Sequence, residues 1–133
     1  MRIYLTHCSK EKSAAAKASG LPLPPDELYT EDGIQQFITA CKQSGIEWAI
    51  LSDKYGVFFP SERHPYYEKP PATVTAAEEQ AIIMQFAEKL AAFDEIWFYI
   101  RPETFHPFYE RVLKGSSLHE RVTLFKDLNE IRG

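Results

Sequence analysis

The sequence predicts an α/β fold: a three-layer α/β/α sandwich around a small, Rossmann-like, mostly parallel sheet of about four strands. The main observation is alternation. Short, β-prone apolar runs alternate with segments whose apolar residues recur at helical spacing, in the order β-α-β-α-β-α-β. Right-handed crossovers then favour the strand order 2-1-3-4. The second observation is the length of 133 residues, which fits a single α/β domain over residues 1–133.

Each predicted element has a local signal. The strands are short runs rich in β-branched and aromatic residues, and they are expected at 2–6, 46–51, 95–100 and 121–126. The helices show apolar residues on one face, and they are expected at about 31–44, 75–92 and 103–114. Thr75 and Glu78 form a capping-box pattern, and Gly45 and Gly115 are placed to end helices. Residues 7–29 and 52–73 remain as long loops, which are often functional in compact domains.

Composition excludes several classes of protein. The formal charge of −4 argues against broad, non-specific nucleic-acid binding. Cys8 and Cys41 are the only cysteines, and their spacing suggests neither a disulfide framework nor a metal site. Neither a signal-peptide pattern nor a membrane-length apolar run is present, so we expect a cytoplasmic protein with no membrane partner. The phosphate-loop, dinucleotide and nucleophile-elbow glycine motifs are also absent, and no cofactor is expected.

The first polar cluster directly follows the first strand. It contains Cys8, Ser9, Lys10 and Lys12, at the carboxyl edge where open α/β sheets bind ligands. Cys8 has three interpretations: a nucleophile activated by nearby cations, a non-covalent ligand contact, or a packing residue. Ser9 and the loop amides are suited to an anion, while Lys10 and Lys12 are either ligand contacts or plain surface lysines.

The second polar cluster follows the second strand. Ser52 ends the strand, Lys54 comes two residues later, and Tyr55 and Gly56 suggest a turn with positive φ at the glycine. Lys54 is suited to a phosphate or a developing oxyanion, and it forms with Cys8 the pair of candidate catalytic residues. The alternative is that Lys54 simply pairs with Asp53.

Three tyrosines and one arginine complete the candidate binding residues. Tyr66 and Tyr67 offer stacking faces for a base, although either one can instead pack the loop onto the sheet. Tyr29 is similarly either a lid over a ligand or a packing residue. Arg101 follows the third strand and is suited to bidentate recognition of an anion, with a helix end or a surface carboxylate as the alternative partner.

These motifs resemble a known family. The runs Cys8-Ser9 with Lys12, Ser52 with Lys54-Tyr55-Gly56, and Pro65 to Glu68 resemble a small uncharacterised α/β domain family of bacteria and phages. That family is similar to the YaaA-type peroxide-stress proteins and to the core domain of archaeosine synthase. The resemblance implies a uracil-DNA-glycosylase-like fold and a link to DNA or to a deazaguanine base in tRNA. Here Lys12 is followed by Ser13-Ala14, where archaeosine synthase continues differently.

Three functions are therefore considered. The first is a protein handling a nucleobase or nucleotide, including an enzyme that acts on a modified purine base within nucleic acid. The second is a non-catalytic nucleotide-binding or signalling module that uses the same crevice. The third is a thiol stress sensor at Cys8, which would require a thiol of low pKa. The sequence leaves the question of catalysis open. The late cluster of aromatic residues also leaves a homodimer face open.

Overall fold

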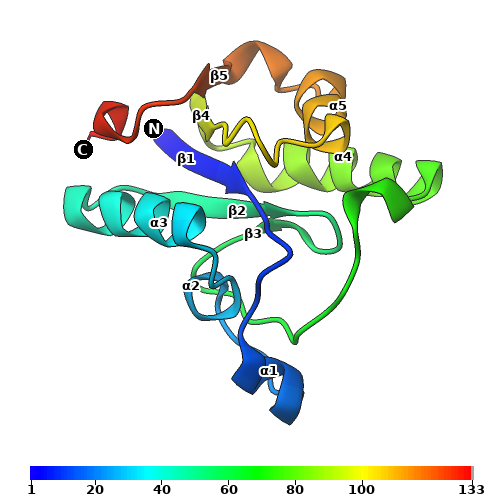
Figure 1. Cartoon of the computed structure of the whole chain (residues 1–133). Coiled ribbons are helices and arrows are strands. Elements are labelled where there is room, and N and C mark those ends of the chain that lie inside the picture. The colour runs from blue at the N-terminus through cyan, green and yellow to red at the C-terminus, as the bar shows by residue number, and fades with distance from the viewer. Residues whose placement is uncertain (133) are drawn as a thin grey trace.

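The computed structural model describes residues 1–132 and confirms the α/β class. Its single sheet contains β1 (Arg2–His7), β2 (Trp48–Ser52), β3 (Gly56–Phe58), β4 (Glu95–Tyr99) and β5 (Val122–Phe125). The strand order is β3-β2-β1-β4-β5, so the four predicted strands lie in the predicted order. These four strands are parallel to one another. The layers and the connections between them are visible in Figure 1.

The fifth strand, β3, is a correction to the expected count of about four. It pairs antiparallel with β2 through Ser52↔Gly56 and Ile50↔Phe58. The turn between the two strands depends on Gly56, whose φ is +68°. A Cβ at this position would also collide with the Gln85 side chain. The loop predicted after β2 therefore begins with a short hairpin rather than with irregular chain.

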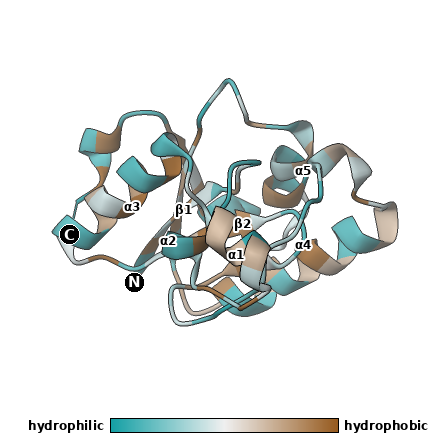
Figure 2. Ribbon diagram, turned by 60° about the horizontal axis from the view of Figure 1, so that its bottom comes forward, coloured by the Kyte–Doolittle hydropathy of each residue, from teal (hydrophilic) through white to brown (hydrophobic). Residues whose placement is uncertain are grey.

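The two faces of the sheet are covered by different helices. The helix α3 (Asp32–Ser44) lies on one face, and α4 (Ala76–Leu90) and α5 (Pro107–Gly115) lie on the other (Figure 1). Hydrophobic and hydrophilic residues alternate along α3 and α4, as expected of helices with one face against a sheet (Figure 2). All five residues of β2 are buried, as in parallel sheets that are covered on both sides.

The helix boundaries follow their capping residues. The predicted capping box is present at the start of α4, where Thr75 and Glu78 cap each other's backbone amides. The third predicted helix starts later than expected, at Pro107, because His106 accepts a hydrogen bond from the amide of Phe108 and proline fits the first helical position. Gly115 is the last residue of this helix, with Ser116 as its C-cap.

The long segment over 7–29 is more ordered than predicted. It contains α1 (Ala14–Ser19), capped by the Ser13 side chain, and the single turn α2 (Pro25–Leu28). Short 3₁₀ turns also occur at Pro71–Thr73, His119–Arg121 and Leu128–Glu130. The two long segments pair with each other through Leu23 and His64, whose backbones exchange two hydrogen bonds of 2.9 Å. This pairing holds both segments beside the carboxyl edge of the sheet.

Candidate functional site

The carboxyl ends of β1 and β2 bring the two predicted polar clusters together. His7 is in register with Leu51, and the amide of Cys8 donates a 3.0 Å hydrogen bond to the Leu51 carbonyl. Cys8 and Ser52 therefore follow strand ends at the same level of the sheet. This juxtaposition is the one that the strand-end positions in the sequence predicted.

Cys8 is a buried thiol with polar neighbours. Its side chain is 5% exposed, and Sγ lies 3.2 Å from the Tyr109 hydroxyl on α5. Burial, together with the Asp53 carboxylate, raises the pKa of Cys8 to about 11, although hydrogen bonds from Tyr109, Tyr67 and the Asp53 backbone oppose this shift. The thiolate is therefore rare at neutral pH, and the cations nearby do not produce the activated thiol that a nucleophile requires.

A chain of three hydroxyl groups lies beside Cys8. The hydroxyl of Tyr67 is 2.8 Å from that of Tyr29 and 2.9 Å from Ser52 Oγ. Tyr29 and Ser52 are fully buried, and Tyr67 is 5% exposed. Burial raises the pKa of both tyrosines well above the ordinary value, so the hydroxyls are neutral. Tyr29 is therefore a core residue in this structure, which corrects its interpretation as a lid over a ligand.

Asp53 is a site residue that the sequence analysis did not select. It is 3% exposed, and among residues 1–132 its Oδ1 has no hydrogen-bond partner. Burial raises the pKa of its carboxyl group, while the Tyr67 hydroxyl, the Cys8 thiol and the charge of Lys12 act in the opposite direction. Asp53 is buried near Cys8, whereas Lys54 is exposed, so the alternative Asp53–Lys54 pairing is not the arrangement found. Its position just past β2 was the signal available in the sequence.

Lysine ammonium groups lie over the tyrosine rings at the outer side of this cluster. Lys12 Nζ is 4.4 Å from the centroid of the Tyr67 ring, and Lys54 Nζ is 5.7 Å from the same centroid. Lys12 and Lys17 also lie 6.0 and 5.5 Å from the ring centroid of Tyr66. We call Lys12, Lys17, Lys54, Tyr66 and Tyr67 the lysine–tyrosine surface. Lys17 was not selected from the sequence.

Lys12 connects this surface with the buried cluster. It is partly buried, and desolvation lowers its pKa, while the Asp53 carboxylate and the ionised form of Cys8 act in the opposite direction. Its ammonium group is therefore close enough to both residues to affect their ionisation. Of the two adjacent tyrosines, Tyr67 faces the cluster. Tyr66 is partly exposed and donates a 2.6 Å hydrogen bond to Glu68.

Several predicted binding residues have structural roles instead. Ser52 Oγ accepts hydrogen bonds from the amides of Lys54 and Tyr55, which closes the turn into β3. The Tyr55 ring stacks on His64 with centroids 3.9 Å apart, and its hydroxyl donates to the Pro65 carbonyl. Gly56 is buried at the turn. Ser52, Tyr55 and Gly56 therefore all contribute to the structure of the turn, and their direct contact with a ligand stays a prediction from the sequence.

Ser9 and Lys10 lie at the entrance of the loop after β1. Ser9 Oγ donates a 2.8 Å hydrogen bond to the Glu11 carbonyl, so its hydroxyl is already engaged. Lys10 is exposed, and its carbonyl accepts a 3.4 Å hydrogen bond from Lys12 Nζ. Of these two predicted contacts, only the Lys10 side chain is free to meet a ligand from solvent.

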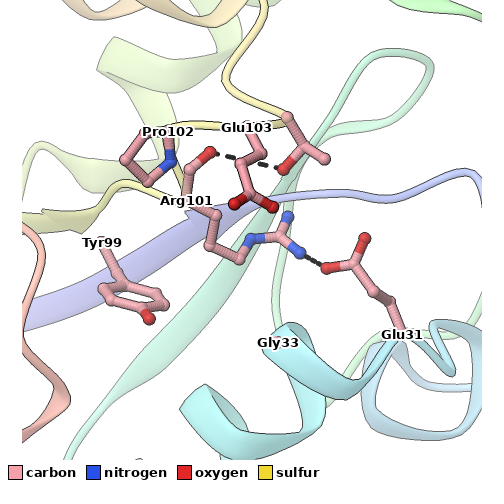
Figure 3. A pocket seen from close by; sticks show the side chains of 7 residues that line it. Glu31, Gly33, Tyr99, Arg101, Pro102 and Glu103 are labelled. Atoms are coloured by element: carbon pink, nitrogen blue, oxygen red, sulfur yellow. Dashed lines mark hydrogen bonds and ion pairs between the residues drawn. The ribbon is translucent and has the colours of Figure 1, made fainter.

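Arg101 follows β4 and lies across the end of β1. It is 9% exposed, donates to the carbonyls of His7 and Cys8, and forms an ion pair with Glu31. Burial lowers the pKa of Arg101 to about 10, so it stays cationic at neutral pH. A surface carboxylate is therefore its partner here, as in the alternative considered from the sequence (Figure 3).

His7 is the buried base beneath Arg101. Burial and the charge of Arg101 lower the pKa of His7 to about 3, so its ring is neutral. His7 Nδ1 lies 2.9 Å from a terminal nitrogen of Arg101 and 3.1 Å from the Cys8 carbonyl oxygen. Among the described residues, Nε2 has no partner. The ring stacks on Tyr109, with centroids 4.9 Å apart.

A cavity of about 360 Å³ opens next to Arg101, near the lower end of the size range of small-molecule sites. It is lined by Glu31, Gly33, Tyr99, Arg101, Pro102, Glu103 and Thr104. Figure 3 shows the Arg101 guanidinium reaching across this space toward Glu31. Across residues 1–132, no group of three or more histidine, cysteine or acidic side chains is arranged to hold a metal ion. Within the same range, no helix combines the length and apolar character needed to cross a membrane.

Comparisons with family models, with curated proteins and with solved structures each gave no match. The family resemblance inferred from the motifs therefore stays an expectation from the sequence.

Proposed function

We propose that the protein binds a nucleobase or a nucleotide, free or within a nucleic-acid strand, at the carboxyl edge of its sheet. One observation carries the proposal: the ammonium groups of Lys12 and Lys54 both lie within 6 Å of the Tyr67 ring centroid, at 4.4 and 5.7 Å. Two cations beside aromatic rings suit a ligand that combines a flat ring with anionic groups.

Each part of the lysine–tyrosine surface has a role in this proposal. Tyr66 is partly exposed, so its ring offers a face on which a base can stack. Lys12 and Lys54 interact with anionic groups of the ligand. Beneath them, Asp53 Oδ1 is a hydrogen-bond acceptor without a partner in the described chain, suited to an N–H group of a base.

A reaction on the bound base is the second candidate, and Asp53 is the observation that favours it. A carboxyl group whose pKa is raised by burial, next to a thiol and a lysine, has the elements of acid–base chemistry. Covalent catalysis by Cys8 has less support, because burial raises the pKa of this thiol to about 11. The same shift disfavours the thiol stress sensor. If catalysis requires Cys8, Cys8→Ala abolishes turnover and retains binding.

A cytoplasmic location accords with this proposal. Both cysteines are free and buried, as expected in a reducing compartment where disulfides are rare. The homodimer remains an expectation from the aromatic residues, and sedimentation of the purified protein would measure its oligomeric state.

The proposed ligand class is tested by a thermal-shift screen. The wild type, Lys54→Ala and Lys12→Ala are screened against nucleobases, deazaguanines, nucleotides and short single-stranded oligonucleotides. Lys114→Ala is the matched control, because Lys114 pairs with Glu110 at the far end of α5. A ligand at about 100 times its Kd stabilises the wild type by about 2.7 kcal/mol. We expect this gain to shrink in both site variants and to persist in Lys114→Ala. A panel without any stabilising ligand would contradict the proposal.

A further inference from the structure

The cavity beside Arg101 lies at the topological switch point of the sheet. β1 lies between β2 and β4, and the connection from β1 to β2 runs through α3 on one face. The connection from β2 to β4 runs through α4 on the other face (Figure 1). In open α/β sheets, the crevice outside the carboxyl ends of the strands at such a point receives ligands. Its lining here comes from the end of β4 and the start of α3.

The first feature of this cavity is the uncapped start of α3. The helix has 13 residues, and the residue before it, Glu31, makes no side-chain capping hydrogen bond to the first amides. Helix starts present free N–H groups and a partial positive charge, which favour an anion. α3 contrasts in this respect with α4, whose capping box is complete.

The second feature is Arg101, which is independent of the helix. Its side chain is only 9% exposed, and its Nε has no hydrogen-bond partner among residues 1–132. The guanidinium is fixed against the strand ends by its bonds to the His7 and Cys8 carbonyls. A buried, fixed guanidinium lining a cavity is preorganised to pair with an oxyanion.

Gly33 allows the helix start and the guanidinium to approach each other. A Cβ at this position would lie 3.0 Å from Arg101 Cδ and 3.2 Å from Glu31 Oε1. The carboxylate of Glu31 lies next to Gly33 and forms an ion pair with Arg101 (Figure 3). An oxyanion group of the chain itself therefore already occupies the space between α3 and Arg101.

We propose that this cavity is an anion site for a phosphate group, and that Glu31 holds the place of the ligand until it is displaced. The phosphate pairs with the guanidinium of Arg101 and accepts hydrogen bonds from the first amides of α3. Glu103 also lines this cavity, but it is exposed, so solvent screens its charge. None of the residues that line this cavity belongs to the lysine–tyrosine surface, so the proposal does not depend on the function proposed there.

The test is a titration with inorganic phosphate at constant ionic strength, followed by the amide NMR signals of Gly33 and Ile34. Glu31→Gln removes the competing carboxylate, and Glu88→Gln on α4 is the matched control with the same change in charge. We expect saturable shifts of both amides, with an affinity on the order of tenfold higher in Glu31→Gln than in the wild type. Glu88→Gln should behave as the wild type.

Two results would overturn the proposal. One is the lack of saturable shifts at Gly33 and Ile34 in Glu31→Gln, and the other is an equal gain of affinity in Glu88→Gln. A parallel titration with acetate separates the ligand classes, because equal binding of acetate at the same amides would contradict the assignment to phosphate. If Glu31→Gln does not fold, the wild type at high phosphate concentration gives the same readout, and unshifted amides there refute the site.

Discussion

The hydroxyl chain beside Cys8 predicts that Tyr67→Phe destabilises the protein. The Tyr67 hydroxyl contacts Tyr29 at 2.8 Å and Ser52 at 2.9 Å, and all three residues are buried. Phenylalanine keeps the ring and its packing but removes the central hydroxyl. The Tyr29 hydroxyl then loses its 2.8 Å hydrogen bond with Tyr67.

The expected magnitude is estimated from the hydroxyl groups of Tyr29 and Ser52, which lose Tyr67 as a partner. A buried polar group without a partner costs about 1–3 kcal/mol, and this applies in full to Tyr29. Ser52 Oγ keeps the amides of Lys54 and Tyr55 as donors, so it loses less. We therefore expect a loss of about 2–3 kcal/mol in the free energy of unfolding, measured by urea denaturation with an unchanged m-value.

The neighbouring tyrosine provides the control. Tyr66→Phe removes a hydroxyl that bonds the exposed Glu68, so no measurable change is expected. The double variant Tyr29→Phe/Tyr67→Phe removes both hydroxyls and should lose less than the sum of the single variants, by about 1 kcal/mol. A Tyr67→Phe variant as stable as Tyr66→Phe would refute the role of the hydroxyl chain.

Two further predictions concern ionisation. The pKa of His7 is about 3 in the folded state and about 6.5 in the unfolded state, because burial disfavours the charged ring. The neutral His7 therefore contributes fully to the stability of the fold above pH 6.5. Between pH 6.5 and about 3, the free energy of unfolding should fall by about 1.4 kcal/mol per pH unit as the pH is lowered. An NMR signal of the His7 ring that titrates near pH 6.5 in the folded protein would contradict this. Because the pKa of Cys8 is about 11, its alkylation rate should rise with pH well beyond pH 9, and the urea-denatured chain is the control. A midpoint near pH 8.5 in the folded protein would show an exposed, ordinary thiol.

Much of the fold is predictable because its signals are local. The apolar run from Ile3 to Leu5 and that from Trp48 to Leu51 mark buried strands, and alternation with helices implies the parallel order found. The capping box at Thr75 and Glu78 gives the start of α4 for the same reason. The hairpin to β3 was missed because only three residues form that strand, too few to show a period.

The sequence predicted the position of the candidate site in the fold better than it predicted which side chains form the site. Strand ends in a parallel sheet meet at one edge, so Cys8, Lys12 and Ser52 were expected near each other before any contact was known. The inward direction of Asp53 was not predictable, because it depends on the turn that Ser52 closes and on the space beside Tyr67. Tyr109 falls within the helix expected at about 103–114, and its contact with Cys8 joins residues 101 positions apart in the chain, which no local pattern predicts.

The sequence by itself determined the class of fold, the strand order and the edge of the sheet at which polar residues gather, because these depend on periodicity and on the handedness of connections. The tertiary structure decided which side chains are accessible and how they ionise. Tyr29 became a core residue, Cys8 a thiol of raised pKa, and Arg101 the partner of Glu31. Burial and long-range contacts set these properties, because the energy of a charge depends on every element packed around it.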